Sequence, residues 1–167
     1  MHYFCHECVQ SRLIRLIAIA VAMSIAAGCE LGSPAGPSSS VSVNHPAELA
    51  YCADEVNRYR ASVGQGPLLR SQALEDFASQ AAKNDGLNHI AHHHFATTNG
   101  GGTAMAETEI LWWRGYGVRS VIHQGLAQMW KGGPDGEHYG ILAGSYTQVG
   151  CGVFVNGSEV TVAQDFR

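Results

Sequence analysis

The sequence has few charged residues and no concentration of either sign. Aspartate, glutamate, lysine and arginine make up 14% of its 167 residues, and its formal net charge is −4. Proteins that bind nucleic acid usually carry a basic patch or stripe, which this composition does not provide. No block of like charges suggests an interaction tail either. Nucleic acid is therefore not an expected partner.

Several familiar sequence patterns are also missing. The apolar stretch over residues 16–28 is shorter than the roughly 20 residues that a transmembrane helix needs. Without H-E-x-x-H a zincin-type peptidase is not supported. Without G-x-S-x-G the usual serine nucleophile of an α/β-hydrolase is missing. These absences exclude the simplest hydrolase classes.

The N-terminal segment has the pattern of a signal peptide. Arg12 and Arg15 supply positive charge, and the apolar core that follows has signal-peptide proportions. The segment ends in Ala26-Ala27-Gly28-Cys29, which resembles the lipobox of bacterial lipoproteins, where the cysteine is acylated and becomes the mature N-terminus. We expect a lipoprotein signal peptide over residues 1–28 and lipidation of Cys29; an ordinary signal peptide is the alternative.

A flexible spacer follows the expected lipid. Residues 29–45 are rich in glycine, serine and proline, a composition that buries little and leaves a chain flexible. This tether would hold one folded domain, residues 46–167, away from a membrane, and that length suffices for a single hydrophobic core. The protein is therefore expected outside the cytoplasm, anchored by its lipid to a membrane of the cell envelope or at the cell surface.

The five cysteines have different expected fates. Cys5 and Cys8 precede the signal core and would be removed with it, while Cys29 would carry the lipid. Cys52 and Cys151 remain as an even pair in an oxidising compartment, where disulfides form and persist. We predict a disulfide between these two residues; two buried free thiols are the alternative.

Apolar periodicity predicts helices first and a β-hairpin last. Spacings of three and four residues indicate three main helices, and alternation over residues 149–155 indicates a strand. Asn156-Gly157 predicts the hairpin turn, while residues 107–113 could form a strand or a buried helix. The expected helix limits are Pro46 and Gly64 for the first, Ser71 and Gly86 for the second, and Ser120 and Gly132 for the third.

Short motifs occur in a definite order along the expected domain. They are Asn57-x-x-Arg60, Gly66-Pro67-Leu68, Ala106-Glu107-Thr108, Met129-Trp130, Glu137-His138-Tyr139 and residues 146–152. This set resembles the CAP superfamily, or SCP domain, which includes cysteine-rich secretory proteins, antigen 5 and plant pathogenesis-related proteins. The resemblance covers residues 46–167 and implies an α+β fold, an α-β-α sandwich in which helices flank a central antiparallel sheet.

The resemblance also implies a cleft that gathers two histidines and two glutamates. Mapped onto this chain, the first three are His93, Glu107 and His138, whereas the second glutamate falls at Gly133. Two imidazoles and a carboxylate suit a borderline metal such as zinc or copper, and three protein ligands leave a position open for water. Without a metal the same groups would form a hydrogen-bonded polar cleft.

Two choices within this cleft stay open. His92 and His94 are alternatives to His93, which we prefer because its distance from the second helix fits the family pattern. Asp135 or Glu137 could replace the missing glutamate. The sequence alone does not decide either question.

Three functions are consistent with these features. The first, which we favour, is a binding module, and the resemblance implies a lipid, sterol or cell-envelope ligand. The second is a metal-dependent hydrolase or peptidase, in which Glu107 or His138 would act as the catalytic base on a metal-bound water. The third is an anchored domain that acts only through its surface.

Overall fold

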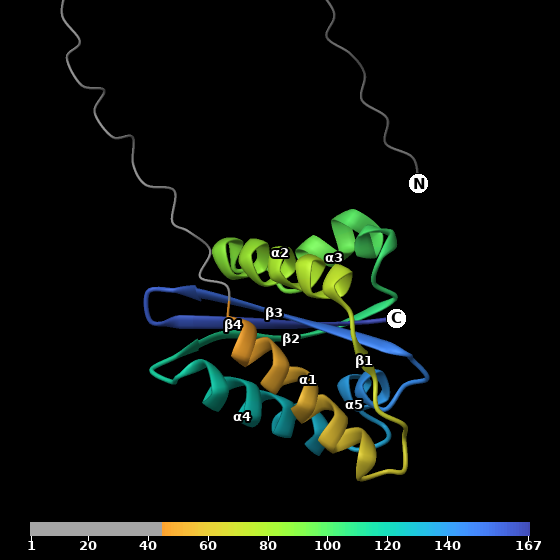
Figure 1. The fold of residues 1–167 in the computed structure, drawn as a ribbon. Helices are drawn as coiled ribbons and strands as arrows, with labels where there is room; N and C mark the ends of the chain where they lie inside the picture. The colour runs from red at the N-terminus through yellow and green to blue at the C-terminus, as the bar shows by residue number, and fades with distance from the viewer. Residues whose placement is uncertain (1–44) are drawn as a thin grey trace, which may run out of the picture. The chain divides into compact units, whose positions relative to one another are not determined.

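A computed structural model describes residues 45–167, and these residues form a sheet between two helical layers (Figure 1). The expected signal peptide, Cys29 and the tether up to residue 44 lie outside the described residues. Among the residues that are described, no helix is both long and apolar enough to span a bilayer. The α-β-α sandwich is confirmed.

The helices and strands alternate irregularly along the chain. The helices are α1 (Pro46–Ala61), α2 (Gln72–Asn88), α3 (His93–Thr98), α4 (Val118–Lys131) and α5 (Glu137–Leu142), with a 3₁₀ turn, η1, over Asn99–Gly102. The strands are β1 (Leu69–Arg70), β2 (Ala106–Arg114), β3 (Gln148–Asn156) and β4 (Glu159–Phe166). Residues 107–113, for which the sequence allowed a strand or a helix, thus form a strand.

The sheet has the strand order β1-β3-β4-β2. The three long strands pair antiparallel, as expected, and the two-residue strand β1 adds a parallel pairing to β3. This order leaves β2 at one edge of the sheet, with β4 as its strand neighbour. The edge position of β2 matters for the site described below. Its side chains form part of that site, and the edge without a neighbouring strand leaves room beside them.

Helix α2 lies very close to one face of the sheet. A side chain at Gly150 would meet the backbone of Leu74 and Glu75, and one at Gly152 would meet the backbone of Ala78 and Ser79. The side of α2 that faces the sheet carries small side chains. Its contacts with β4 include the fully buried residues Ala78, Ala81 and Ala82. Glycine on the strand and alanine on the helix therefore permit the close approach.

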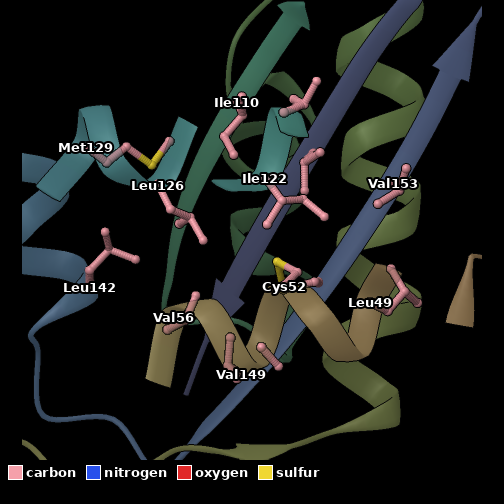
Figure 2. Packing of buried hydrophobic residues seen from close by; sticks show 14 of the residues in the cluster. Leu49, Cys52, Val56, Ile110, Ile122, Leu126, Met129, Leu142, Val149 and Val153 are labelled. Atoms are coloured by element: carbon pink, nitrogen blue, oxygen red, sulfur yellow. A yellow bond between two sulfur atoms is a disulfide. The ribbon is translucent and has the colours of Figure 1, made fainter. Parts of the chain in front are cut away.

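The larger apolar core lies on the opposite face, under α1, α4 and α5 (Figure 1). In Figure 2, Cys52 and Val56 of α1 lie beside Ile122 of α4 and Val149 of β3. The predicted disulfide between Cys52 and Cys151 is confirmed and joins α1 to β3. Because it spans 99 residues, the chain-entropy model gives it a contribution of about 4–5 kcal/mol.

Helix limits differ from the expected ones where glycine has another role. Helix α4 begins at Val118 after the extended residue Gly117, so Ser120 lies inside the helix rather than capping it. Helix α2 begins after Ser71, as expected, but continues past Gly86 to Asn88. A side chain at Gly86 would meet Phe154 and Thr161, so this glycine serves packing against the sheet rather than helix termination.

The hairpin turn is shifted by one residue from its expected place. Asn156 pairs with Glu159, so the loop residues are Gly157 and Ser158 rather than Asn156 and Gly157. Gly157 has a φ of 60°, a conformation that glycine adopts readily and that short hairpin loops require. The hairpin itself is as predicted.

Replacing Gly152 with alanine tests the close contact between α2 and β3. The added methyl group would overlap the backbone of Ala78 and Ser79, so we expect Gly152→Ala to lower the free energy of unfolding by about 2–3 kcal/mol. Gly140→Ala is the matched control, because a side chain there meets no atom within 4 Å. Thermal unfolding should show an unchanged or slightly higher midpoint for the control, and equal midpoints would contradict the packing argument.

Candidate functional site

Two glutamates on β2 form the base of the site. Successive side chains of a strand point to opposite faces, so Glu107 and Glu109 share a face while Ile110 points into the apolar core on the other side. Glu107 is 5% exposed and Glu109 is 6% exposed. Carboxylates are seldom buried to this extent without a partner.

His92 lies over these two carboxylates. It precedes α3 in a left-handed conformation, with a φ of 54°. Its amide donates to Glu109 Oε2 at 2.7 Å, and its ring Nδ1 lies 2.9 Å from Glu107 Oε1. One ligand atom from each of the three residues lies within 4.8 Å of the others, a spacing that a single metal ion could bridge.

Two further contacts hold the turn that carries His92. The His94 amide donates to Asp85 Oδ1 at 2.9 Å, and Trp112 Nε1 donates to the Asp85 carbonyl at 3.2 Å. Trp112 has a φ of 57° and lies where the pairing of β2 with β4 shifts register. Irregularities of this kind redirect a side chain from its regular course. The end of α2, the histidine turn and β2 are therefore joined around Asp85.

A fourth carboxylate lies beside the glutamates. Asp165 of β4 is directly opposite Glu107 in the strand register and is fully buried. Burial raises the pKa of Asp165 to about 9, with repulsion from Glu107 as the next cause, and burial raises the pKa of Glu109 to about 8. Burial also raises the pKa of Glu107, while the hydrogen bond to Glu107 raises the pKa of His92. The site thus favours bound protons or a bound cation.

An open pocket of about 310 Å³ adjoins His92 and Glu107. Its lining residues are His92, Phe95, Ala106, Glu107, Glu137, His138 and Ile141. A second pocket of about 310 Å³ continues along β2 and shares His138 with the first. The two pockets give a ligand access to both the carboxylates and the imidazoles.

The N-x-x-R motif of α1 fixes the elements around this pocket. Asn57 accepts a hydrogen bond from the Leu68 amide and donates one to the Leu68 carbonyl. Arg60 is 2% exposed, and its Nη1 donates to the carbonyls of Leu142 and Gly144. Leu142 is the last residue of α5 and Gly144 lies just after that helix. Because α5 carries His138, the second expected histidine, Arg60 helps to hold this helix in place.

The expected site residues are only partly brought together. Glu107 and His138 line one pocket, but the histidine beside Glu107 is His92, and His93 is not in that cluster. The physical reason is the left-handed turn at His92, which directs its ring and amide at the glutamates. Of the two replacements considered for the missing glutamate, Glu137 lines the pocket.

Sequence reasoning missed Glu109, Asp85 and Asp165. The alternation Glu107-Thr108-Glu109 could have indicated a second carboxylate on the same face, once this segment was taken as a strand. Asp165 joins the site through the register between β2 and β4, and Asp85 joins it through the amide of His94. No motif in the sequence indicated these long-range pairings.

The model of the cysteine-rich secretory protein (CAP) family matches residues 53–166 of this chain. No curated protein matches the sequence. An outer surface protein from Borrelia burgdorferi aligns with 14% identity and a TM-score of 0.53, over 75% of this chain and 96% of that one. A cysteine-rich secretory protein from Staphylococcus aureus aligns with 16% identity and a TM-score of 0.47, over 75% of this chain and 40% of that one.

The buried acids predict a stability that falls as pH rises in metal-free protein. An acid whose pKa is higher in the folded than in the unfolded state stabilises the fold at low pH, and this contribution is lost as pH rises through the folded pKa. For Glu109 and Asp165 the folded values are about 8 and about 9. We therefore expect the unfolding midpoint in chelator to fall between about pH 5 and about pH 9.

Asp165→Asn should flatten this pH profile because it removes the acid with the higher pKa. Asp54→Asn replaces an exposed acid of α1 and should leave the profile unchanged. Thermal unfolding followed by circular dichroism across the pH range measures both variants. A stability that rises steadily with pH in the unmodified protein would contradict the assignment.

Proposed function

The chain belongs to the cysteine-rich secretory protein family, and we propose that it serves as an extracytoplasmic binding module whose cleft holds a divalent metal ion. The ion would be bound by His92, Glu107 and Glu109 and would face the pocket lined by His138. A ligand would then reach the ion from that pocket.

The observation that carries this proposal is the convergence of one imidazole and two buried carboxylates within 4.8 Å. These groups come from the turn before α3 and from β2, so only the tertiary fold brings them together. One nitrogen and two carboxylate ligands suit zinc, manganese or iron. Protein ligands on one side and a pocket on the other would leave positions free for water or a ligand.

The pocket supports a binding role of limited size. A volume of about 310 Å³ is at the lower end of the range for small-molecule sites. It therefore suits a polar head group or one end of a longer molecule better than a complete lipid or sterol. Among the expected ligands, a cell-envelope molecule that presents an anionic or carbonyl oxygen to the ion agrees best with this geometry.

The proposed location rests on three cysteines, two in a disulfide and one at the expected lipid site. The bond between Cys52 and Cys151 is typical of oxidising compartments outside the cytoplasm. The lipobox-like sequence ending at Cys29 supports attachment to a membrane through lipid. The Borrelia burgdorferi protein of similar fold is an outer surface protein, which is compatible with the same location for this chain.

A metal-dependent hydrolase is the second candidate. A carboxylate oxygen that the ion leaves free would act as general base toward a metal-bound water. Glu107 and Glu109 are equal candidates for this role, because each has one oxygen bonded to His92 and one oxygen without a partner. The hydrolase hypothesis stays a prediction.

Substitution of adjacent histidines tests the metal site. Loss of a residue that only hydrogen-bonds to a metal ligand typically weakens metal binding by about 10- to 100-fold. Because His92 would bind the ion directly, we expect His92→Gln to weaken the binding of zinc or manganese by a larger factor. His93→Gln is the matched control and should bind the ion as the unmodified protein does. Calorimetric titration at neutral pH measures each affinity. If no transition metal binds the unmodified protein, the proposal fails; if only His93→Gln loses the ion, the site is His93.

Replacing Cys29 tests the anchor. Cys29→Ser should move the protein from the membrane fraction to the soluble fraction of the cells and abolish incorporation of a radiolabelled fatty acid. Cys8→Ser should change neither result, because Cys8 lies in the segment expected to be removed. Equal membrane retention of both variants would refute lipidation at Cys29.

A further inference from the structure

Exposed apolar side chains gather at one end of the domain, where β3 turns into β4 (Figure 1). Within residues 45–167, seven large apolar or aromatic side chains are exposed, and four of them belong to this end. These four are between 41% and 53% exposed and are Leu87, Ile90, Tyr116 and Val155. We call this surface the hairpin end. Single exposed apolar residues are ordinary, whereas a group of them often marks an interaction site.

The last turn of α2 contributes one side of the hairpin end. The His89 ring lies 5.3 Å from the ring of Trp112, and its Nε2 lies 2.9 Å from Oε2 of Glu159, the first residue of β4. Leu87 and Ile90 lie on either side of His89 in the sequence. The contacts of His89 therefore place both of these exposed side chains beside the hairpin.

The loop before α4 contributes the other side. The rings of Trp113 and Tyr116 lie 5.8 Å apart. Trp113 and Val155 both pair with Val160 in the strand register, from opposite neighbours of β4. Directly opposite residues share a face of the sheet, so these side chains form one continuous apolar surface toward α4.

The chain enters the domain at the same end. Glu48, in the first turn of α1, pairs with Arg119, in the first turn of α4, at 3.6 Å, and α4 begins two residues after Tyr116. The tether expected over residues 29–45 leads directly into α1. A chain of that length would reach on the order of 20–25 Å, so a lipid on Cys29 would keep this end near a membrane.

The charges of the hairpin end are balanced. Two exposed arginines, Arg114 and Arg119, pair with Glu159 and Glu48 respectively. An anionic bilayer would therefore not repel this surface. Aromatic side chains favour the boundary between lipid and water, and a guanidinium group binds lipid phosphate well. Its composition thus suits contact with lipid head groups.

We propose that the hairpin end rests on the membrane that carries the anchor, with Leu87, Tyr116 and Val155 at the boundary between lipid and water. This inference rests on the lipid anchor proposed for Cys29. Because the tether would hold the domain close to the bilayer, contacts that are weak in free solution suffice to orient it.

This orientation leaves the cleft accessible. Strand β2 runs from Ala106, which lines the pocket beside His92, to Arg114 at the hairpin end. Its nine residues span about 25 Å. A domain that stands on its hairpin end would therefore hold that pocket well above the bilayer, open to ligands from outside the cell membrane.

Fluorescence quenching in vesicles tests the orientation. The full lipidated protein would be purified from membranes and reconstituted into vesicles of phosphatidylethanolamine and phosphatidylglycerol. Some of the lipids carry a nitroxide on the head group, which quenches tryptophan near the bilayer surface. We expect quenching of the emission, because Trp112 and Trp113 lie at the hairpin end.

The double variant Tyr116→Ser/Val155→Ser should lower the ratio of membrane-bound to free domain by about tenfold and lose most of the quenching, because two apolar side chains no longer leave water. Val63→Ser/Leu69→Ser is the matched control. Its two side chains are 44% and 70% exposed and lie beyond the other end of α1, so the quenching should not change. Leu87→Ser is a second test variant, should the first not fold, and should also reduce the quenching.

The outcomes separate the orientation from the anchor. Mass spectrometry of the same sample shows whether Cys29 carries lipid, and its absence would refute the anchor together with this inference. Lipid on Cys29 without quenching, or equal quenching in the test and control variants, would overturn the orientation alone. Dimers that form through the hairpin end in place of quenching would assign this surface to a second copy of the chain.

Discussion

The close approach of α2 to the sheet determines the depth and position of the candidate site. Gly150 and Gly152 on β3 leave no side chain between strand and helix, so α2 lies directly on the sheet. Its last turn then places Asp85 in a fully buried position beside β2. The chain leaves the helix through the left-handed residue His89 and reaches His92 above Glu107. The carboxylate cluster and the histidine are thus consequences of a backbone contact several turns away.

The two faces of the sheet carry different kinds of residue. The face toward α1, α4 and α5 carries the large apolar core and the disulfide between Cys52 and Cys151. The other face holds buried acids that have few partners. Proteins commonly carry such destabilising groups where they bind ligands. Because β2 is an edge strand, its acids Glu107 and Glu109 also border open pockets.

Much of the fold could be predicted from the sequence because it depends on local patterns. Alternating apolar residues predicted the hairpin strands, and apolar residues three and four positions apart predicted the buried face of α1. The even pair of cysteines left in the folded domain predicted the disulfide. The site was less predictable, since it depends on tertiary relations. The choice of His92 over His93 is made by a left-handed backbone turn that no residue type in the segment demands. Asp165 joins the site only through strand pairing, whereas Glu109 could have been inferred from its spacing to Glu107.

Diffraction from crystals grown with manganese tests the central claim most directly, because this ion accepts both imidazole and carboxylate ligands and scatters anomalously. The account predicts an anomalous peak within about 2.6 Å of carboxylate oxygens of Glu107 and Glu109. The same peak should also contact His92, the third residue of the site proposed for the cleft. A well-ordered cluster of these carboxylates with no anomalous peak beside them would contradict the account.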